Sequence, residues 1–327
     1  MAETMRAIVQ VGTGGPEVLR LQEVPKPAVK PGHLLVRVTA VGVNYVDTMR
    51  RRGWVPVPPE EPYIPGIEVA GVVESVGEGV TSWQVGQRVM AWVPSGAYAE
   101  FCLVPHHRAM PVPDNLSDPE AAAVPVNWLT AYFALVTLGK LQPGERVLIH
   151  AAAGGVGTAA VQIAKLLGGI VFATAGSDDK VDLVRRLGAD VSINYEQDDF
   201  EAVVHRHTDG QGVHLVLESV GGDVFTKSVR CLAGRGRLIV YGHASGKEGV
   251  LTSGELFRRR LTVACVAGGA MIDDPTVATD AKERVAAWLR EGKVRPIVGE
   301  VHPLSDAGLA QHRLETRQTK GKVVLVP

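Results

Sequence analysis

The segment of this sequence that most clearly indicates chemistry is a glycine-rich run, His150-Ala-Ala-Ala-Gly-Gly-Val-Gly157. It follows a short apolar stretch, and Ala152, Gly154 and Gly157 fall at the small-residue positions of a Gly-x-Gly-x-x-Gly pattern that opens a helix. Small residues there let the backbone approach a pyrophosphate, and the helix N-terminus stabilises its charge. The run predicts a dinucleotide-binding turn. The residues expected to contact the cofactor are Ala153, Gly154, Gly155, Val156 and Gly157.

The type of dinucleotide depends on a second segment, Thr174-Ala-Gly-Ser-Asp-Asp-Lys180. NAD-binding proteins usually carry an acidic residue here that accepts the ribose 2′-hydroxyl, and this chain has Ala175 instead. Without that carboxylate a 2′-phosphate is not repelled, while Ser177 and Lys180 can hydrogen-bond and neutralise it. Asp178 and Asp179 argue against NADPH if their carboxylates face the ribose, where they would repel a 2′-phosphate. Alternatively, they are the acidic residues that stabilise the N-terminus of the next helix. The segment predicts NADPH as the cofactor.

The elements that must position these loops alternate between strands and helices. Buried strands are predicted at Val147–Ile149, Ile170–Thr174, Val191–Ile193, Val213–Leu217, Arg237–Tyr241 and Leu261–Val266, and intervening helices at Gly157–Leu167 and Asp179–Leu187. Strands separated by helices indicate a parallel, doubly wound α/β sheet of the Rossmann type. Beyond Gly269, helices are expected at Thr276–Arg290 and Ser305–Arg317, and a final strand at Lys322–Val326.

The N-terminal part of the chain has a different sequence pattern, in which short runs of strand-forming residues are separated by Gly and Pro. Strands are predicted at Arg6–Gln10, Val18–Gln22, Leu34–Val41, Val69–Val76, Arg88–Trp92 and Ala97–Val104. In Leu34–Val41 the apolar Val36, Val38 and Ala40 alternate with Arg37 and Thr39, as in a half-buried strand. These runs predict an antiparallel, barrel-like domain. A capping box at Ser117-Asp-Pro-Glu120 then opens a helical region that extends to Leu138.

Length and charge set limits on function. A chain of 327 residues suits two domains, and a net charge of −1 provides no field to attract nucleic acid or an anionic membrane surface. The arginine runs Arg50–Arg52 and Arg258–Arg260 could bind a phosphorylated substrate or, as we favour, complement the C-terminal dipoles of short helices. Three cysteines without a CxxC pattern, and no signal-peptide or membrane-spanning pattern, favour the cytoplasm.

Seven segments spread over essentially the whole chain form a further pattern: Gly15–Leu19, Ala40–Asp47, Ile64–Gly71, Gly86–Val89, Leu129–Tyr132, Ala151–Gly157 and Gly321–Val324. Together, and in this order, they resemble the zeta-crystallin-type quinone oxidoreductases, which are zinc-free members of the medium-chain dehydrogenase/reductase superfamily. This resemblance implies a GroES-like β-rich catalytic domain, residues 1–125 completed by 268–327, and a Rossmann NADP-binding domain, residues 126–267.

The resemblance also implies roles for individual residues. It places Asn44 near the nicotinamide ring and Thr130 across from it, and it assigns Gly176, Ser177, Lys180 and Tyr195 to the 2′-phosphate pocket. A sheet-edge aromatic remains the alternative for Tyr195. Further cofactor contacts carried over in this way are Ser219, Gly242, His243 and Arg317.

The sequence departs from the zinc-dependent relatives at their ligand positions. Asn44 stands in place of a Cys and Ile67 in place of a His, and a further Cys expected near Pro125 is also missing. Only Glu68 remains as a ligand type, and Cys102 is interpreted as a small core residue, so no metal is expected. Trp54 replaces the tyrosine usual in the family, which changes a substrate contact.

The predicted function is NADPH-dependent reduction of a quinone or related conjugated carbonyl by direct hydride transfer. The alternative enzyme is an enoyl or 2-alkenal C=C reductase in which Tyr45 or water supplies the proton. A third hypothesis, a nucleotide-dependent RNA-binding or structural protein, is disfavoured by the near-zero charge. The resemblance, and a candidate edge strand at Leu261–Val266, predict a homodimer. The physiological acceptor depends on loops around Trp54–Tyr63 and Gly268–Asp274, whose shapes the sequence does not give.

Overall fold

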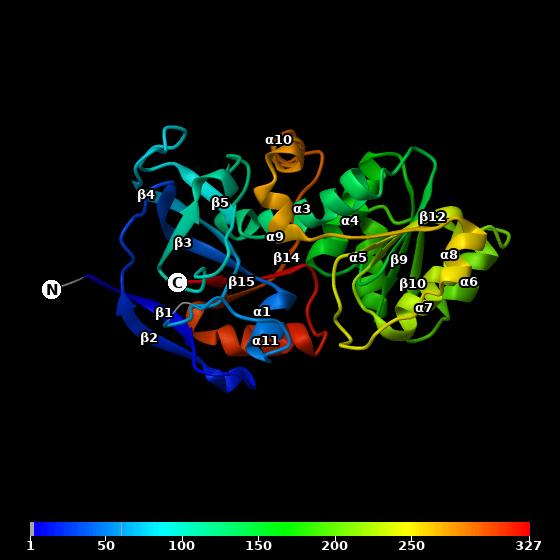
Figure 1. The fold of residues 1–327 in the computed structure, drawn as a ribbon, viewed down its shortest axis with the longest axis horizontal. Helices are drawn as coiled ribbons and strands as arrows, with labels where there is room; N and C mark the ends of the chain where they lie inside the picture. The colour runs from blue at the N-terminus through cyan, green and yellow to red at the C-terminus, as the bar shows by residue number, and fades with distance from the viewer. Residues whose placement is uncertain (1–2, 60) are drawn as a thin grey trace. The chain divides into compact units, whose positions relative to one another are not determined.

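The chain forms two compact units in a computed structural model that describes residues 3–59 and 61–327 (Figure 1). Met1, Ala2 and Glu60 lie outside the described residues, so the first two residues of the predicted catalytic domain and one position of the Trp54–Tyr63 loop are not covered. The β-rich unit combines the described residues of Met1–Val126 with Ile272–Pro327, and the α/β unit comprises Asn127–Met271.

The β-rich unit contains a two-stranded and a seven-stranded sheet. Strands β1 (Thr4–Gln10) and β2 (Leu19–Pro25) pair antiparallel. The larger sheet has the order β14-β15-β3-β4-β5-β7, with β6 also paired to β3. Its strands are β3 (His33–Val43), β4 (Glu68–Val76), β5 (Arg88–Trp92), β6 (Phe101–Pro105), β7 (Ala109–Pro111), β14 (Val298–Pro303) and β15 (Lys322–Val326).

The predicted antiparallel arrangement is confirmed except at one end of the large sheet, where β14 runs parallel to β15. The sequence analysis did not predict β14. The C-terminal strand β15 pairs antiparallel with β3, which places Val323 opposite Val43. The last residues of the chain thus complete a sheet that begins near its N-terminus.

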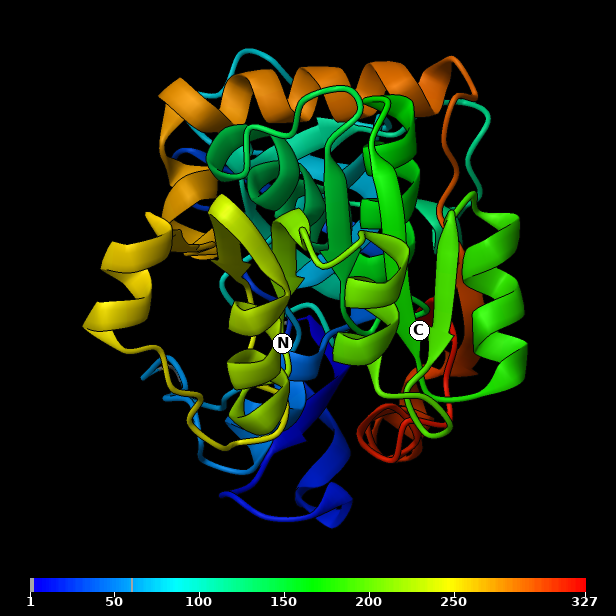
Figure 2. The same cartoon turned by 90° about the vertical axis from the view of Figure 1, so that its right-hand side faces the viewer.

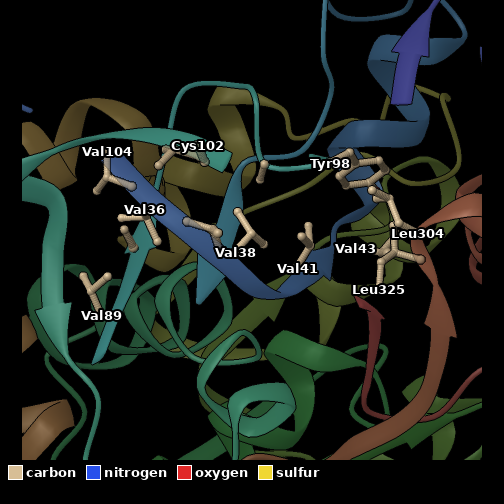
Figure 3. Packing of buried hydrophobic residues seen from close by; sticks show 14 of the residues in the cluster. Val36, Val38, Val41, Val43, Val89, Tyr98, Cys102, Val104, Leu304 and Leu325 are labelled. Carbon is tan, nitrogen blue, oxygen red and sulfur yellow. The ribbon is translucent and has the colours of Figure 1, made fainter. Parts of the chain in front are cut away.

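The core of the β-rich unit lies on the inner face of β3 (Figure 3). Val36, Val38 and Ala40 are buried, whereas Arg37 is exposed, so the predicted alternation is confirmed. Val104, Leu304 and Leu325 pack into the same cluster from other elements. Cys102, at 2% exposure, belongs to this core, as the sequence interpretation required.

The helices of this unit are mostly short. They are η1 (Pro16–Val18), α1 (Tyr45–Arg51), η2 (His106–Arg108), α2 (Asp118–Ala121), the 16-residue α10 (Pro275–Arg290), η4 (Leu304–Asp306) and α11 (Ala307–Glu315). Helix α9 (Gly268–Asp273) begins in the α/β unit and ends in the β-rich unit. The predicted capping box at Ser117 and Glu120 is present in α2. Helix α1 has a capping box of its own, formed by Asn44 and Asp47.

The arginine runs follow helix ends as predicted, since Arg50 and Arg51 lie in the last turn of α1 and Arg258 and Arg259 in the last turn of α8 (Ser253–Arg259). For Arg51, the predicted interaction with the C-terminal dipole of the helix is only part of its role. Its side chain is 1% exposed and forms an ion pair of 2.6 Å with Glu315, because α11 packs against α1.

The α/β unit is built on a six-stranded, wholly parallel sheet of order β10-β9-β8-β11-β12-β13. Counted along the chain this is the order 3-2-1-4-5-6 of dinucleotide-binding sheets, so the predicted Rossmann architecture is confirmed. The strands are β8 (Arg146–Ile149), β9 (Ile170–Ala175), β10 (Val191–Asn194), β11 (Val213–Glu218), β12 (Leu232–Val240) and β13 (Thr262–Cys265).

Helices surround this sheet (Figure 2). They are α3 (Pro125–Tyr132), the π-helical η3 (Phe133–Leu138), α4 (Gly155–Leu166), α5 (Asp178–Arg186), α6 (Phe200–His207), α7 (Gly222–Cys231) and α8. Helices α4 and η3 pack together, as do α6 and α7. Helices α4 and α5 were predicted from the sequence, and so was a short helix ending at Arg258–Arg260, which is α8, whereas α6 and α7 were not.

Among the described residues one helical segment, Asp118–Leu138, is long and apolar enough to cross a membrane by length and composition. Most of it is covered by the protein, because 83% of its most apolar window is buried. This apolarity therefore reflects a core position.

Candidate functional site

Most of the predicted cofactor residues lie at one edge of the α/β unit, where its parallel strands end. The glycine loop follows β8, Gly176 and Ser177 follow β9, and Tyr195 follows β10. Ser219 follows β11, and Gly242 and His243 follow β12. Ligands of open parallel sheets bind at this carboxyl edge, so the structure collects these residues where a dinucleotide would bind.

The glycine loop allows the close approach that the sequence predicts. Helix α4 begins at Gly155 with Gly154 as its N-cap, so the loop leads directly into a helix N-terminus. A Cβ atom at Gly157 would lie 2.4 Å from the Ala151 carbonyl oxygen and 2.5 Å from the Ala152 Cα, which no side chain permits. The turn therefore requires glycine at the third position of the pattern.

Helix α3 contributes a residue to this loop that the sequence analysis missed. The side chain of Asn127 is 4% exposed, and its amide nitrogen would lie 2.5 Å from a Cβ atom at Gly155. A side chain at position 155 would therefore require the Asn127 side chain to shift. Thr130 lies one turn further along α3 and is also buried, at 6% exposure.

The loop after β9 contains the residues assigned to the 2′-phosphate. Ala175 is the last residue of β9, so no carboxylate occupies the strand end. A Cβ atom at Gly176 would meet the Tyr195 hydroxyl oxygen at 2.4 Å, and the Tyr195 side chain is 37% exposed. Gly176 and Tyr195 therefore form a contact from adjacent strands that any larger residue at position 176 would disrupt.

The two aspartates that complicated the cofactor interpretation are helix-terminal residues. Ser177 is the N-cap of α5, and Asp178 and Asp179 lie in its first turn together with Lys180. The Asp178 carboxylate accepts hydrogen bonds from Asn194 Nδ2 at 2.7 Å and Gln197 Nε2 at 3.2 Å. Asp179 accepts a hydrogen bond from the Ser177 hydroxyl. Both carboxylates thus have hydrogen-bond partners within the α/β unit. The Ser177 hydroxyl must give up its hydrogen bond to Asp179 before it can donate to a ligand.

The loops after β11 and β12 support each other. Ala244 N donates to the Ser219 carbonyl at 2.9 Å, and a Cβ atom at Gly242 would lie 3.1 Å from that same carbonyl oxygen. Below them, one oxygen of the buried Glu218 carboxylate accepts from the amides of Val220 and Gly221 at 2.8 and 3.0 Å. Burial raises the pKa of Glu218. Glu218 therefore fixes the backbone that presents Ser219.

In the β-rich unit, Asn44 is held in a buried polar cluster with Glu68 and Lys322. Lys322 Nζ lies 2.5 Å from Glu68 Oε2 and donates to Asn44 Oδ1 at 2.7 Å. Asn44 Nδ2 in turn donates to Glu68 Oε2 at 3.1 Å, and Val126 N donates to Glu68 Oε1 at 2.7 Å. Asn44, Glu68 and Lys322 are buried, at 7%, 0% and 3% exposure, so the Lys322 ammonium and the Glu68 carboxylate neutralise each other away from water while the uncharged Asn44 amide hydrogen-bonds to both. The Asn44 amide is thereby fixed in one orientation.

A second buried acid supports the start of α1. Asp47 Oδ2 accepts from the Asn44 backbone amide at 2.9 Å and from the Tyr98 hydroxyl at 3.1 Å. Burial raises the pKa of Asp47 to about 6. The sequence analysis did not single out Asp47 or Lys322. A lysine in the apolar strand Lys322–Val326 was the available signal, because a buried ammonium requires a partner.

Tyr45, the candidate proton donor, is the first residue of α1 and is partly buried. Burial and the Glu315 carboxylate raise its pKa, and Arg52 and Arg317 oppose that shift. Arg317 is exposed and has a left-handed backbone, with φ 59°. Asn44, Tyr45 and Arg317 belong to the β-rich unit, and the other predicted site residues to the α/β unit.

The donor set at the expected metal position does not resemble a catalytic zinc site. Asn44 offers an amide, Ile67 offers no donor, and the Glu68 carboxylate is already bound to a lysine ammonium. Within residues 3–59 and 61–327 no group of three or more His, Cys, Asp or Glu side chains is arranged to hold a metal ion.

Known families match both units. Residues 30–114 match the family described as the alcohol dehydrogenase GroES-like domain, and residues 155–287 match that described as zinc-binding dehydrogenase. The chain is 37% identical to a 2-haloacrylate reductase from a Burkholderia species, with 96% of both chains covered. The chain belongs to the medium-chain dehydrogenase/reductase superfamily.

Quinone oxidoreductases of this superfamily are similarly related. The chain is 36% identical to the Pseudomonas aeruginosa quinone oxidoreductase, over 96% of this chain and 97% of that one. The structure of Escherichia coli quinone oxidoreductase complexed with NADPH superimposes with a TM-score of 0.91 at 33% identity, covering 99% of both chains. The chain is therefore an oxidoreductase with a GroES-like β domain and a Rossmann sheet, and the predicted resemblance is confirmed at this level.

Proposed function

We propose that this oxidoreductase uses NADPH to reduce quinones or related conjugated carbonyl compounds, by direct hydride transfer and without a metal. The observation that carries this proposal is the Asn44–Glu68–Lys322 cluster, in which the one remaining metal-type ligand is neutralised by an ammonium group. An acceptor whose reduced form is a delocalised anion can take up hydride without a Lewis acid, because it can then be protonated by water. Quinones and conjugated carbonyls have this property.

The α/β unit supplies features that fit NADPH. The required glycine at position 157, the α4 N-terminus and the uncharged strand end at Ala175 suit a pyrophosphate and a 2′-phosphate. Lys180 would neutralise the 2′-phosphate and Tyr195 would hydrogen-bond to it. The bound cofactor supplies the hydride. Asn44, Thr130, Ser219, Gly242, His243 and Arg317 are proposed to position it, and positioning is the main catalytic effect.

Reduction of an activated C=C bond is the second candidate, favoured by the relationship to a 2-haloacrylate reductase. In this reaction a proton must reach the α-carbon. The raised pKa of Tyr45 keeps its hydroxyl protonated at neutral pH, so Tyr45 could donate that proton. Tyr45→Phe should then slow alkenal reduction by about 10²-fold or more while affecting quinone reduction much less.

A substrate panel tests the proposal. Purified protein is mixed with NADPH and either phenanthrenequinone, a 2-alkenal or a crotonyl thioester, and NADPH consumption is recorded against enzyme-free controls. Turnover of the quinone supports quinone reduction, whereas turnover of the alkenal or thioester alone supports the C=C reductase. If none of the three acceptors causes NADPH consumption above the enzyme-free control, both candidates are contradicted.

We further propose that the chain is a cytoplasmic homodimer that associates through the α/β unit. Strand β13 is the last in its sheet, and among the described residues no strand pairs with its outer edge. Phe257, on the adjacent α8, is 84% exposed, and Val250 is 61% exposed. An unpaired edge beside exposed apolar side chains favours contact with a second copy.

A further inference from the structure

Helix α1 presents a second functional group on the face that carries Tyr45. Arg52 follows Tyr45 by seven residues, which is two helical turns, so the two side chains emerge from the same face roughly 10 Å apart along the axis. Met49 lies between them and is partly buried. A small molecule that contacts the Tyr45 side chain is therefore within reach of the Arg52 guanidinium.

Positive charge exceeds negative charge around this face. The Glu315 carboxylate, only 6% exposed, lies 2.6 Å from Arg51 NH2 and 2.7 Å from Arg52 Nε. Arg51 is buried and also donates to Gln311 Oε1 at 2.7 Å, so it is committed to the packing of α1 against α11. Arg317 is a third guanidinium close enough to influence the pKa of Tyr45. The single Glu315 carboxylate is thus shared by two guanidinium groups, and the charge it leaves unbalanced attracts an anion.

Arg52 retains its hydrogen-bonding capacity. The contact of its guanidinium with Glu315 Oε1 is an ion pair without hydrogen-bond geometry, and the Arg52 side chain donates no hydrogen bond to a described residue. Its side chain is 44% exposed. The Arg52 guanidinium carbon lies 5.1 Å from the centroid of the Trp54 ring, which is itself 49% exposed. The indole orients the guanidinium by a cation–π interaction and provides a flat apolar wall next to it.

We propose that Arg52 and Trp54 bind an anionic group of the acceptor, so that the preferred acceptors are unsaturated compounds that carry a carboxylate. A guanidinium fork matches the two oxygens of a carboxylate, and the indole covers the carbon skeleton attached to it. This inference rests on the proposed function, because it specifies the acceptor class of the same site. For a C=C acceptor, hydride adds to the β-carbon and a proton to the α-carbon, and the two electrons come from the reduced nicotinamide.

The test compares each acid with its methyl ester, which matches the reacting group and differs in charge. One pair is 3-(1,4-naphthoquinon-2-yl)propanoate and its ester, and the other is 4-carboxycinnamaldehyde and its ester. The readout is the ratio of kcat/KM for the acid to kcat/KM for the ester, measured in the same protein. We expect Arg52→Gln to lower this ratio about tenfold or more, since a charge-assisted bidentate contact is lost.

Two further variants separate recognition from folding and from net charge. Arg52→Lys keeps the charge and should restore part of the ratio. Arg37→Gln removes another exposed arginine of the β-rich unit, 4.0 Å from Glu74 and 54% exposed against 44% for Arg52, and should leave the ratio within twofold of wild type. The ratio in wild type should also fall as NaCl rises from 50 to 500 mM, because salt screens an exposed contact.

The outcomes distinguish the inference from the proposed function. If both esters are reduced and Arg52→Gln leaves the ratio unchanged, the inference is wrong and the proposed function stands. If no compound is reduced, the proposed function is wrong, and calorimetric titration with 3-phenylpropanoate decides the inference. Binding that weakens about tenfold in Arg52→Gln supports an anion site, whereas absent or unchanged binding overturns it.

Discussion

Replacing Lys180 by alanine should weaken the use of NADPH far more than the use of NADH. Lys180 lies in the first turn of α5, after the uncharged end of β9, where a 2′-phosphate is proposed to bind. A charge-assisted hydrogen bond to that phosphate contributes about 1.5–3 kcal/mol. This corresponds to roughly ten- to a hundredfold in affinity.

The neighbouring acids reduce this gain without cancelling it. In water-like surroundings, a carboxylate about 7 Å from one phosphate charge opposes it by about 0.6 kcal/mol. Asp178 and Asp179 are both engaged by hydrogen bonds from neighbouring side chains, which disperse their charge. Because Lys180 is only partly buried and water screens its contact, we expect the lower part of the range for Lys180→Ala, a rise of about tenfold in the NADPH Michaelis constant.

Steady-state kinetics with both cofactors at saturating acceptor measure this effect. Lys180→Ala should change the NADH Michaelis constant less than twofold, and Tyr195→Phe should cost less than Lys180→Ala because it removes a neutral donor. Arg185→Ala is the matched control, since it removes a positive charge from the last turn of the same helix. Equal losses for both cofactors in Lys180→Ala, or a wild type that uses NADH as efficiently as NADPH, would refute the interpretation of this loop.

Three other predictions follow from the structure. Dialysis against a strong chelator should leave turnover intact, and stoichiometric zinc whose removal abolishes activity would disprove metal independence. Phe257→Glu should convert the proposed dimer into a monomer at micromolar concentration by light scattering; an unchanged mass in the variant would exclude Phe257 from the interface, and a monomeric wild type would refute the dimer. Hydrogen bonding to Arg313 holds the pKa of Glu300 at about 2, below its ordinary value, so the ion pair should stabilise the fold above about pH 4.5 and lose that effect as the pH falls toward 2. Glu300→Gln should then lower the free energy of unfolding by roughly 1 kcal/mol at pH 7, because solvent screens this partly exposed pair, and by less near pH 2; an equal loss at both pH values would show that the charge is not responsible.

Local patterns were sufficient to predict the elements that carry the cofactor loops. The glycine run, the preceding β8 and the following α4 are encoded within a few residues, because turn geometry and helix capping act over short distances. Contacts between distant segments were not predictable in this way. Asn127 reaches Gly155 only because α3 packs on the loop, and Lys322 meets Glu68 only because β15 and β4 both flank β3.

The arginine run at Arg50–Arg52 illustrates the same limit. Its position at a helix end was predicted, but its three members have different environments. Arg51 is buried against Glu315 of α11, whereas Arg52 is exposed beside Trp54. Sequence spacing places all three at the C-terminal end of one short helix, and the packing of α11 against it distinguishes Arg51 from Arg52.

The most direct test of the proposed function is the rate of NADPH oxidation by phenanthrenequinone, measured at 340 nm with metal-free protein. The account predicts enzyme-dependent oxidation of NADPH that proceeds about tenfold or more efficiently than oxidation of NADH under the same conditions. Oxidation no faster than the enzyme-free background, or activity that appears only when zinc is added, would contradict it.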